Sequence, residues 1–268
     1  MIEIRGLICG YGSQFSLRNI NLKVERGEIL GIIGPNGSGK TTLLRAMSRV
    51  LKPKTGMILF EEKDIWQMGF KELSTKMAVV SQSIDVGDIA VEEFVLLGRT
   101  PYFSSFQFLE TKMDLDIAEK AMRLTGIFAL KDRPMTKMSG GERQLAVIAR
   151  ALAQEPKVLL LDEPTTHLDI AHQVVVLDII KRLNRKLGIT IIVVLHDLNL
   201  ASEYCERIVL INDGRVYKIG KPEEVLTYQT IEEVYNTVVV VERNPVSSKP
   251  YVLVVSEEER QRKKREEK

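Results

Sequence analysis

Eight residues, GPNGSGKT at positions 34–41, restrict the possible folds of this chain more than any other part of its sequence. They follow a short apolar run, residues 28–33, and precede a helical pattern at residues 40–49. The pattern G-x-x-x-x-G-K-[ST] in this context is typical of a loop that binds phosphate, because its backbone N–H groups converge on an anion at a helix N-terminus. We therefore expect a nucleotide phosphate to bind here.

The loop supplies most of the candidate nucleotide-binding residues. Lys40 is expected to reach the β and γ phosphates and to take part in catalysis, while Thr41 offers its hydroxyl to Mg²⁺. The remaining candidates in this segment are Gly34, Pro35, Asn36, Gly37, Ser38, Gly39 and Thr42. The alternative is a glycine-rich turn that binds no nucleotide, and the strand and helix expected on either side disfavour it.

Short, mostly β-branched runs alternate with longer helical patterns along the chain. The expected strands are residues 28–33, 77–81, 158–161, 190–195 and 207–211, and the expected helices are residues 40–49, 141–154 and 170–186. Strands that are apolar nearly throughout suit a parallel sheet covered by helices on both faces. From about residue 84 to residue 156 the strand signal disappears, which indicates an inserted helical subdomain.

Two hairpins are expected near the C-terminus. Asp213 and Gly214 separate two apolar runs and predict a tight turn. Residues 238–242 and 251–255 flank a longer connection and predict a second, looser hairpin. The last thirteen residues, 256–268, are almost all charged or polar, so a polar helix or a frayed tail is expected there.

Composition excludes several classes of protein. The 268 residues are 44% hydrophobic and 28% charged, as in ordinary globular proteins, and the formal net charge of +2 indicates no nucleic-acid partner. Only Cys9 and Cys205 are present, so we expect reduced thiols and no cysteine-based metal cluster. No apolar run approaches the roughly 20 residues that span a bilayer, and Glu3 stands where a secretion signal would be basic. The protein is expected to remain inside the cell and to rely on other chains for any membrane work.

Two further segments carry groups that phosphoryl transfer requires. Residues 158–163 read VLLLDE, so Asp162 is expected to hold Mg²⁺ through water and Glu163 to act as general base. His196 follows the apolar run 190–195 and is expected to reach the γ phosphate or the attacking water at the same edge of the sheet. Taken alone, adjacent acids often belong to a solvated loop and a lone histidine is usually structural. The phosphate loop favours the catalytic interpretation of both.

The segment MSGGE at residues 138–142 precedes the acidic strand and, with the elements above, resembles the signature of the ATP-binding subunit of an ABC transporter. The resemblance extends over nearly the whole chain. In chain order the matching residues are Tyr11, the loop from Gly34 to Thr42, Gln82, Ser139, Asp162 with Glu163, Asp169 and His196. It implies a single domain over residues 1–268 with the α/β fold of ABC-type P-loop NTPases: a mostly parallel core sheet, an N-terminal antiparallel β part, the inserted helical subdomain, and a C-terminal hairpin and tail at about 237–268.

The resemblance also implies ATP and Mg²⁺ as cofactors and gives roles to residues outside the loop. Tyr11 would stack on adenine, although an aromatic there could equally be a surface or core residue. Gln82 would sense Mg²⁺ together with Thr41 and Asp162, partly through water.

The signature would act in a second copy of the chain. Ser139, Gly140 and Gly141 would close on the γ phosphate held by the partner in an ATP-bound homodimer, and Asp169 would reach across the seam. Glu142 departs from the glutamine usual in the family. An acid here would repel phosphate unless it is solvated or paired with Arg143 or another base.

Three segments suggest a subgroup. LLGRTPY at 96–102, PTTHLDI at 164–170 and NPV at 244–246 are similar to ATPases of importers for iron(III)-siderophores, haem and cobalamin. The resemblance implies a peripheral protein on the cytoplasmic face of the cell membrane, attached only through polytopic permease subunits and served indirectly by an extracytoplasmic substrate-binding protein. The aromatic residues Phe94, Tyr102, Phe103 and Phe106 are expected either to line the permease groove or to pack internally.

Other functions remain open. The chain could be the ATPase of an importer for another substrate, a soluble mechanical ABC-type ATPase of translation or DNA repair, or a binding module that does not hydrolyse ATP. The single ATPase unit and the lack of sustained heptads argue against the mechanical class. Glu163 and His196 argue against an inactive binding module.

Overall fold

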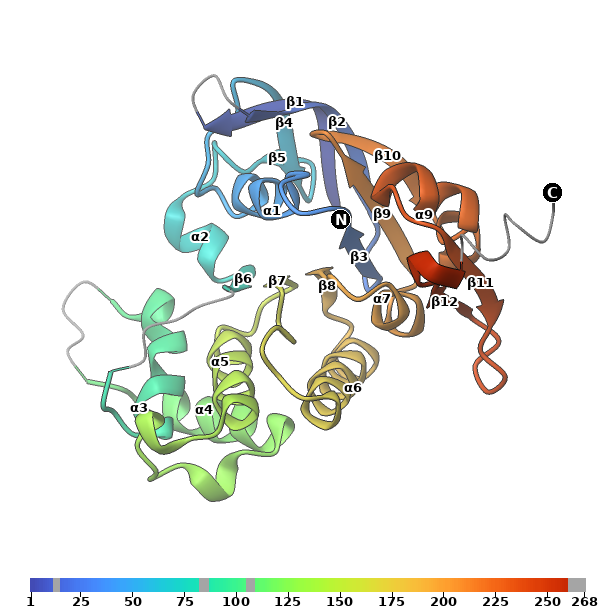
Figure 1. Cartoon of the computed structure of the whole chain (residues 1–268). Helices are drawn as coiled ribbons and strands as arrows, with labels where there is room; N and C mark the ends of the chain where they lie inside the picture. Colours follow the sequence, from blue (N-terminus) through green and yellow to red (C-terminus); the bar gives the residue numbers. More distant parts are fainter. Residues whose placement is uncertain (12–14, 82–86, 105–108, 260–268) are drawn as a thin grey trace, which may run out of the picture.

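The computed structural model describes residues 1–11, 15–81, 87–104 and 109–259 (Figure 1). Its strands are β1 (Ile2–Tyr11), β2 (Phe15–Val24), β3 (Ile29–Ile33), β4 (Thr55–Phe60), β5 (Lys63–Asp64), β6 (Met77–Val80), β7 (Val158–Asp162), β8 (Thr190–Val194), β9 (Arg207–Asn212), β10 (Arg215–Gly220), β11 (Val239–Arg243) and β12 (Pro250–Val254). The α-helices are α1 (Lys40–Met47), α2 (Phe70–Ser74), α3 (Val91–Leu96), α4 (Lys112–Thr125), α5 (Gly140–Ala153), α6 (Ile170–Leu187), α7 (Leu198–Tyr204), α8 (Pro222–Val225) and α9 (Tyr228–Tyr235). Three short 3-10 helices are η1 (Leu97–Tyr102), η2 (Phe128–Leu130) and η3 (Met135–Lys137).

The core sheet has the strand order β10-β9-β3-β8-β7-β6, and all its neighbours are parallel except β9 and β10. Both faces are covered. On β3, Ile29 and Ile33 pack into the cluster that includes α5 and α6, whereas Leu30 and Ile32 pack into the cluster that includes α1 and the N-terminal strands. This two-sided burial explains the uninterrupted apolar strands and confirms the predicted parallel sheet.

The N-terminal strands form a separate antiparallel sheet in the order β2-β1-β4-β5 (Figure 1). Alternate residues of β1, among them Ile2 and Ile4, are fully buried against α1 and the core sheet. The predicted fold class, with its N-terminal antiparallel part, parallel core and helical insert, is confirmed.

Helices α3, α4 and α5 lie together, apart from the N-terminal sheet (Figure 1). No strand of a named sheet occurs among the described residues from 87 to 155. The boundaries at about 84 and 156 stay a prediction. Helix α5 begins one residue earlier than the pattern suggested, because Ser139 already provides its N-terminal cap.

The C-terminal part packs on the helix that follows β8. Strands β11 and β12 form the second predicted hairpin, with Val241 opposite Val252. The edge of β12 bonds to a side chain of α7: the N–H of Val252 donates to Asn199 Oδ1 at 2.7 Å, and Asn199 Nδ2 donates to Val252 O at 3.2 Å. No helix in the described part of the chain is long and apolar enough to cross a membrane.

Candidate active site

The phosphate loop connects β3 to α1 and depends on backbone conformations that favour glycine. Gly34, Gly37 and Gly39 have φ angles of 149°, 78° and 108°. A Cβ on Gly34 would also lie 2.1 Å from the carbonyl oxygen of Ile211. Only glycine combines this backbone with so close an approach, so the spacing of the motif follows from the geometry of the turn.

Lys40 and Thr41 begin α1 at the floor of this loop. The Lys40 side chain is buried, and its Nζ donates to Gly34 O at 2.9 Å and Pro35 O at 3.0 Å. Burial lowers the pKa of Lys40, while the nearby carboxylates of Glu163 and Asp162 raise it. Without nucleotide, the loop carbonyls therefore compensate the buried ammonium group.

Asp162 ends β7 directly beside this helix start. Thr41 Oγ1 donates to Asp162 Oδ1 at 3.2 Å. Burial raises the pKa of Asp162, and the Thr41 hydrogen bond opposes that effect. The predicted pairing of the loop with the acidic strand is thus visible in the geometry.

Glu163 and His196 come from neighbouring strands and meet at the same edge of the sheet. His196 Nε2 contacts Glu163 Oε1, and Thr166 Oγ1 donates to Glu163 Oε2 at 3.1 Å. Glu163 has a φ of 53°, in the left-handed region that a non-glycine residue adopts only at a cost. Thr166 was not predicted, and its position three residues after Glu163 is the only sequence signal that could have indicated it.

A cavity of about 720 Å³ opens above these groups. Its lining consists of Asn36, Gly37, Gly39, Lys40, Thr41, Thr42, Glu163 and His196. Parts of the chain more than 150 residues apart in sequence therefore line one site, as the motifs predicted.

The chemistry of this lining fits a nucleotide phosphate and Mg²⁺. Ser38 Oγ is buried and has no hydrogen-bond partner within the described residues, which is costly unless an anion or water accepts its proton. Thr41 and Asp162 present hydroxyl and carboxylate oxygens, the donors that Mg²⁺ prefers. The loop can hold the phosphates and this pair can hold the metal.

The signature segment caps α5 at a separate place. Glu142 N donates to Ser139 Oγ at 3.3 Å, and Ser139 N donates to Glu142 Oε2 at 2.8 Å. The hydrogen bond from the Ser139 backbone is the main cause that lowers the pKa of Glu142, and Arg133, 3.6 Å away, adds to it. Of the alternatives expected for Glu142, pairing with another base is the one observed, and that base is Arg133. The Arg143 guanidinium donates to Met138 O at 3.5 Å.

Asp169 caps α6 next to the signature. Its Oδ1 accepts from His172 N at 2.8 Å and also contacts His172 Nδ1 at 2.8 Å. A Cβ on Gly141 would lie 2.2 Å from the His172 ring, so the N-termini of α5 and α6 are in contact. None of the described residues 139–141 or 169 lines the phosphate cavity of its own chain.

The remaining predicted residues have different outcomes. Tyr11 is 51% exposed and its hydroxyl accepts from Arg45 Nη1 at 2.9 Å, so it is not a core aromatic and lies beside α1. Phe94 is only 2% exposed and packs beneath Arg150, which is the internal alternative rather than an exposed groove. Gln82 and Phe106 lie outside the described residues.

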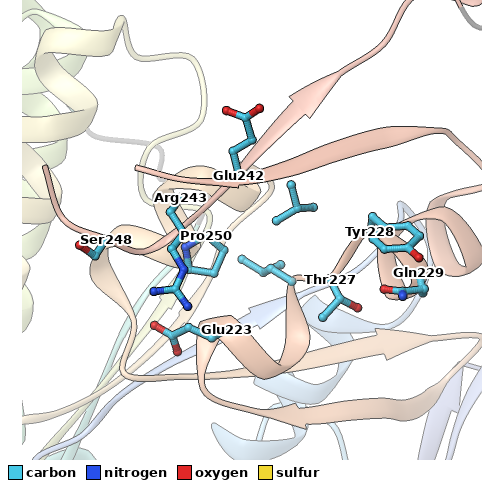
Figure 2. Close-up of a pocket in the computed structure, with 10 residues that line it drawn as sticks. Glu223, Thr227, Tyr228, Gln229, Glu242, Arg243, Ser248 and Pro250 are labelled. Carbon is cyan, nitrogen blue, oxygen red and sulfur yellow. The ribbon is translucent and has the colours of Figure 1, made fainter. Parts of the chain in front are cut away.

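A second cavity, of about 330 Å³, lies between α8, α9 and the β11–β12 hairpin (Figure 2). Glu223, Tyr228 and Arg243 are among its lining residues, and it contains none of the phosphate-loop residues. Sequence patterns did not indicate it. One link from this region to the active site is Tyr235 at the end of α9: burial raises its pKa, and a hydrogen bond from the Gly34 backbone partly opposes that rise.

A phosphate loop, a Thr–Asp pair for a metal and a Glu–His pair on one sheet edge define a P-loop ATPase, and the separately capped signature helix defines its ABC class. The chain belongs to the ABC transporter family, whose model matches residues 17–166. The protein is thus an ABC ATPase, of the kind that couples ATP hydrolysis to transport.

Individual relatives agree with this family. The chain is 39% identical over 254 residues to the ferric enterobactin transport ATP-binding protein FepC of Escherichia coli, with 94% of this chain and 93% of that protein covered. It is 40% identical to the uncharacterized ABC transporter ATP-binding protein YvrA of Bacillus subtilis, with 96% of this chain covered, but it spans only 59% of the length of YvrA.

Solved structures are similar in the same way. A metal-chelate type ABC transporter in an inward-facing conformation matches with a TM-score of 0.84 and 26% identity, covering 96% of this chain and 98% of the other. The dimeric ATP-binding cassette MJ0796, in a post-hydrolysis state with ADP and Pi, matches with a TM-score of 0.71 and 28% identity, covering 82% and 98%. ABC cassettes thus dimerise and occur within transporter complexes.

Proposed function

We propose that this chain hydrolyses ATP to drive an ABC importer of iron(III)-siderophores or a related metal chelate. The observation that carries the proposal is the Glu163–His196 pair, which lines one cavity together with Lys40 and Thr41. Thr41 is in turn hydrogen-bonded to Asp162. The name of FepC and the metal-chelate type of the matching transporter support the substrate class. Haem and cobalamin are the alternative cargoes of the same subgroup.

The phosphate loop binds and orients ATP. Backbone N–H groups of residues 36–41 point at the phosphates, and Lys40 Nζ leaves the carbonyls of Gly34 and Pro35 to bind β- and γ-phosphate oxygens. Thr41, Gln82 and Asp162 would hold Mg²⁺, Asp162 through a water molecule. When bound, Mg²⁺ neutralises charge on the phosphates as the transition state forms.

Glu163 accepts a proton from the attacking water. One hydrogen bond from Thr166 and the contact with His196 hold its carboxylate at the cavity, and its strained backbone fixes the direction of the side chain. His196 orients Glu163 and the γ phosphate. Tyr11, exposed beside α1, provides a face for the adenine ring.

Hydrolysis takes place in a homodimer formed in the presence of ATP. Ser139, Gly140 and Gly141 form the N-terminus of α5, a place that suits an anion but lies outside its own chain's cavity. A second copy, arranged head to tail, would bring this segment to the γ phosphate and Asp169 to the seam. The dimeric cassette that contains ADP and Pi supports this arrangement.

The chain works at the cytoplasmic face of the cell membrane. It attaches there only through polytopic permease subunits, which receive cargo from an extracytoplasmic substrate-binding protein, and it has no nucleic-acid partner. Closure of the ATP-bound dimer moves the permease between its outward-facing and inward-facing states. The energy comes from the tighter binding of ATP to the closed dimer than to the open one. A soluble role in translation or DNA repair is disfavoured by the relatives named for transport.

The test is to isolate the tagged chain from native membranes in mild detergent and to identify its companions by mass spectrometry. A polytopic membrane protein in equal amount is expected, and loading the complex with labelled iron chelates, haem and cobalamin would then identify the cargo. Recovery of ribosomal or DNA-repair proteins without a membrane protein would overturn the transport role and leave the ATPase chemistry intact.

A further inference from the structure

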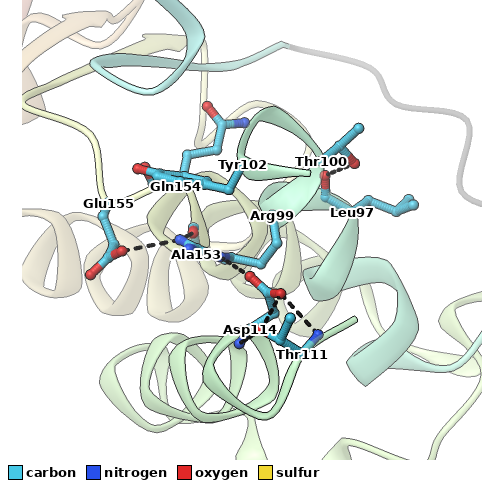
Figure 3. Close-up of polar contacts among 9 residues, drawn as sticks. All are labelled: Leu97, Arg99, Thr100, Tyr102, Thr111, Asp114, Ala153, Gln154 and Glu155. Atoms are coloured by element: carbon cyan, nitrogen blue, oxygen red, sulfur yellow. Dashed lines mark hydrogen bonds and ion pairs between the residues drawn. The ribbon is translucent and has the colours of Figure 1, made fainter. Parts of the chain in front are cut away.

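Arg99 is the largest fully buried side chain of the described residues, with 1% exposure. It lies in η1, and its guanidinium reaches two other elements (Figure 3). Nε donates to Asp114 Oδ1 of α4 at 3.0 Å, while Nη1 donates to Ala153 O, the last residue of α5, at 2.7 Å and to Glu155 Oε2 at 3.0 Å. One planar group therefore joins η1, α4 and the carboxyl end of α5.

Neighbouring residues reinforce the contact between η1 and α5. A Cβ on Gly98 would lie 2.1 Å from the carbonyl oxygen of Arg150, so the backbone of η1 is in direct contact with α5. The Tyr102 ring packs 3.9 Å from the Arg99 guanidinium carbon, and its hydroxyl donates to Gln154 O at 2.8 Å. Several contacts with the carboxyl end of α5 thus fix the position of η1.

Stability alone does not require this arrangement. Burying an arginine and an aspartate has a desolvation cost that often equals or exceeds their attraction, and apolar pairs of similar volume are often as stable. An apolar pair, however, makes no directional hydrogen bonds and so does not fix the relative orientation of the helices. The arginine fork bonds several acceptors in fixed geometry, which a lysine or a methionine cannot do.

Because α5 is long, its orientation at the carboxyl end determines where the signature lies at its N-terminus. The helix has 14 residues, so Ser139 at its N-terminus lies about 20 Å from the carboxyl end that Arg99 holds. A rotation of about 6° at the carboxyl end would move Ser139 by about 2 Å on a 20 Å arm. Hydrogen bonds of about 2.9 Å do not tolerate such a displacement.

We propose that Arg99 is a positioning residue that holds η1, α4 and α5 as one rigid unit and thereby sets the position of Ser139 for closure of the ATP-bound dimer. The inference rests on the proposed function, because it assumes that the signature binds the γ phosphate of a second copy. Arg99 itself contacts neither the phosphate cavity nor its lining.

The test compares ATP-dependent dimerisation of purified variants, all in a Glu163→Gln background, by analytical ultracentrifugation. Arg99→Met should weaken dimerisation at least tenfold, because charge-assisted hydrogen bonds are lost. The ATP affinity of the monomer should be unchanged, since the phosphate loop is intact. Arg123→Met is the matched control: Arg123 also makes an ion pair on α4 and packs on an aromatic ring, but at the surface.

A second variant distinguishes an effect on folding stability from an effect on the position of Ser139. Arg99→Met/Asp114→Asn removes both buried charges and leaves an amide oxygen to accept from Thr111, so the thermal midpoint should recover towards that of the parent. Dimerisation should stay weak. Arg99→Lys keeps the charge without the fork and should restore dimerisation only in part.

The outcomes are distinct. If dimerisation recovers together with the thermal midpoint, Arg99 only stabilises the fold and the positioning role is wrong. If Arg99→Met dimerises like Arg123→Met, the role is also wrong. If the Glu163→Gln parent itself forms no dimer with ATP, the proposed dimer mechanism is wrong, and the positioning role of Arg99, which assumes that dimer, is overturned with it.

Discussion

At the scale of single residues, the site depends on a few side chains with competing contacts. Lys40 is buried, and its ammonium group donates to the carbonyl oxygens of Gly34 and Pro35 in its own loop. When ATP binds, its phosphate oxygens must replace these carbonyls as acceptors for the buried positive charge. Glu163 combines a left-handed backbone with contacts to Thr166 and His196. Strain of this kind persists where the surrounding structure holds a residue for function.

Replacing Glu163 by glutamine tests its role as general base. The amide keeps the shape and a hydrogen-bond acceptor for Thr166 but cannot take a proton, so ATP turnover should fall by about 10²–10⁴-fold while ATP binding remains. Phosphate release and ATP affinity are the two measurements. Turnover equal to that of the unsubstituted protein would contradict the assignment.

At the scale of elements, the N-termini of α5 and α6 support each other. Ser139 and Glu142 cap α5 reciprocally, Asp169 caps α6, and Gly141 leaves room for the His172 ring between them. Helix starts that expose free N–H groups are ordinarily satisfied by such caps. The elements that are proposed to meet ATP in the dimer are thus ordered before any partner arrives.

Gly141→Ala tests the contact between these helices. The new methyl would lie 2.2 Å from the His172 ring and must displace it, so the thermal midpoint should fall. Gly140→Ala is the matched control, because its methyl would lie 3.5 Å from a Leu168 methyl in ordinary contact and alanine favours the helix. His172→Ala added to Gly141→Ala should restore stability. An unchanged midpoint for Gly141→Ala would contradict this packing.

Glu142 makes a prediction about pH. Its pKa is lowered in the folded state, so its contribution to stability is full above the ordinary glutamate pKa and disappears as the pH falls through the lower folded value. Glu142→Gln should therefore cost about 0.5 kcal/mol near pH 7, through loss of a charge at a helix N-terminus. The difference from the unsubstituted protein should vanish in acid, as measured by urea unfolding across pH. A constant difference at all pH values would exclude the charge as its cause.

At the scale of the whole molecule, the C-terminal hairpin is joined to the active site through α7. Asn199 bonds the backbone of Val252 in both directions, and Ser202 Oγ donates to Pro250 O at 2.7 Å. Helix α7 begins two residues after His196. The β11–β12 hairpin therefore supports the segment that carries His196, the proposed catalytic histidine.

Asn199→Ala should lower the free energy of unfolding by about 2 kcal/mol, because it leaves the buried N–H and carbonyl of Val252 without this partner. Turnover should fall as the support of His196 weakens, while ATP affinity changes little. Asn244→Ala, within the hairpin connection and away from α7, should leave turnover unchanged. Chemical unfolding and steady-state ATPase assays measure both effects, and equal turnover in the two variants would contradict the link.

Patterns that are local along the chain were sufficient for much of this protein. The phosphate loop, the acidic strand end, the signature cap and the five parallel strands of the core sheet each depend on residues close in sequence, whose backbone preferences and apolar periodicity act over a few positions. For this reason the fold class and the meeting of Lys40, Glu163 and His196 at one cavity, with Asp162 bonded to Thr41, were predictable. Parallel strands that end at one edge necessarily bring such residues together.

Contacts between distant segments were decided only by the folded chain. Arg133 pairs with Glu142 in place of the adjacent Arg143, and Phe94 is buried under Arg150. The Arg99 network likewise joins three elements separated by up to 56 residues. Each depends on how packed helices orient long side chains, which local propensity does not encode, because burial and the choice among competing partners exist only after the elements have met.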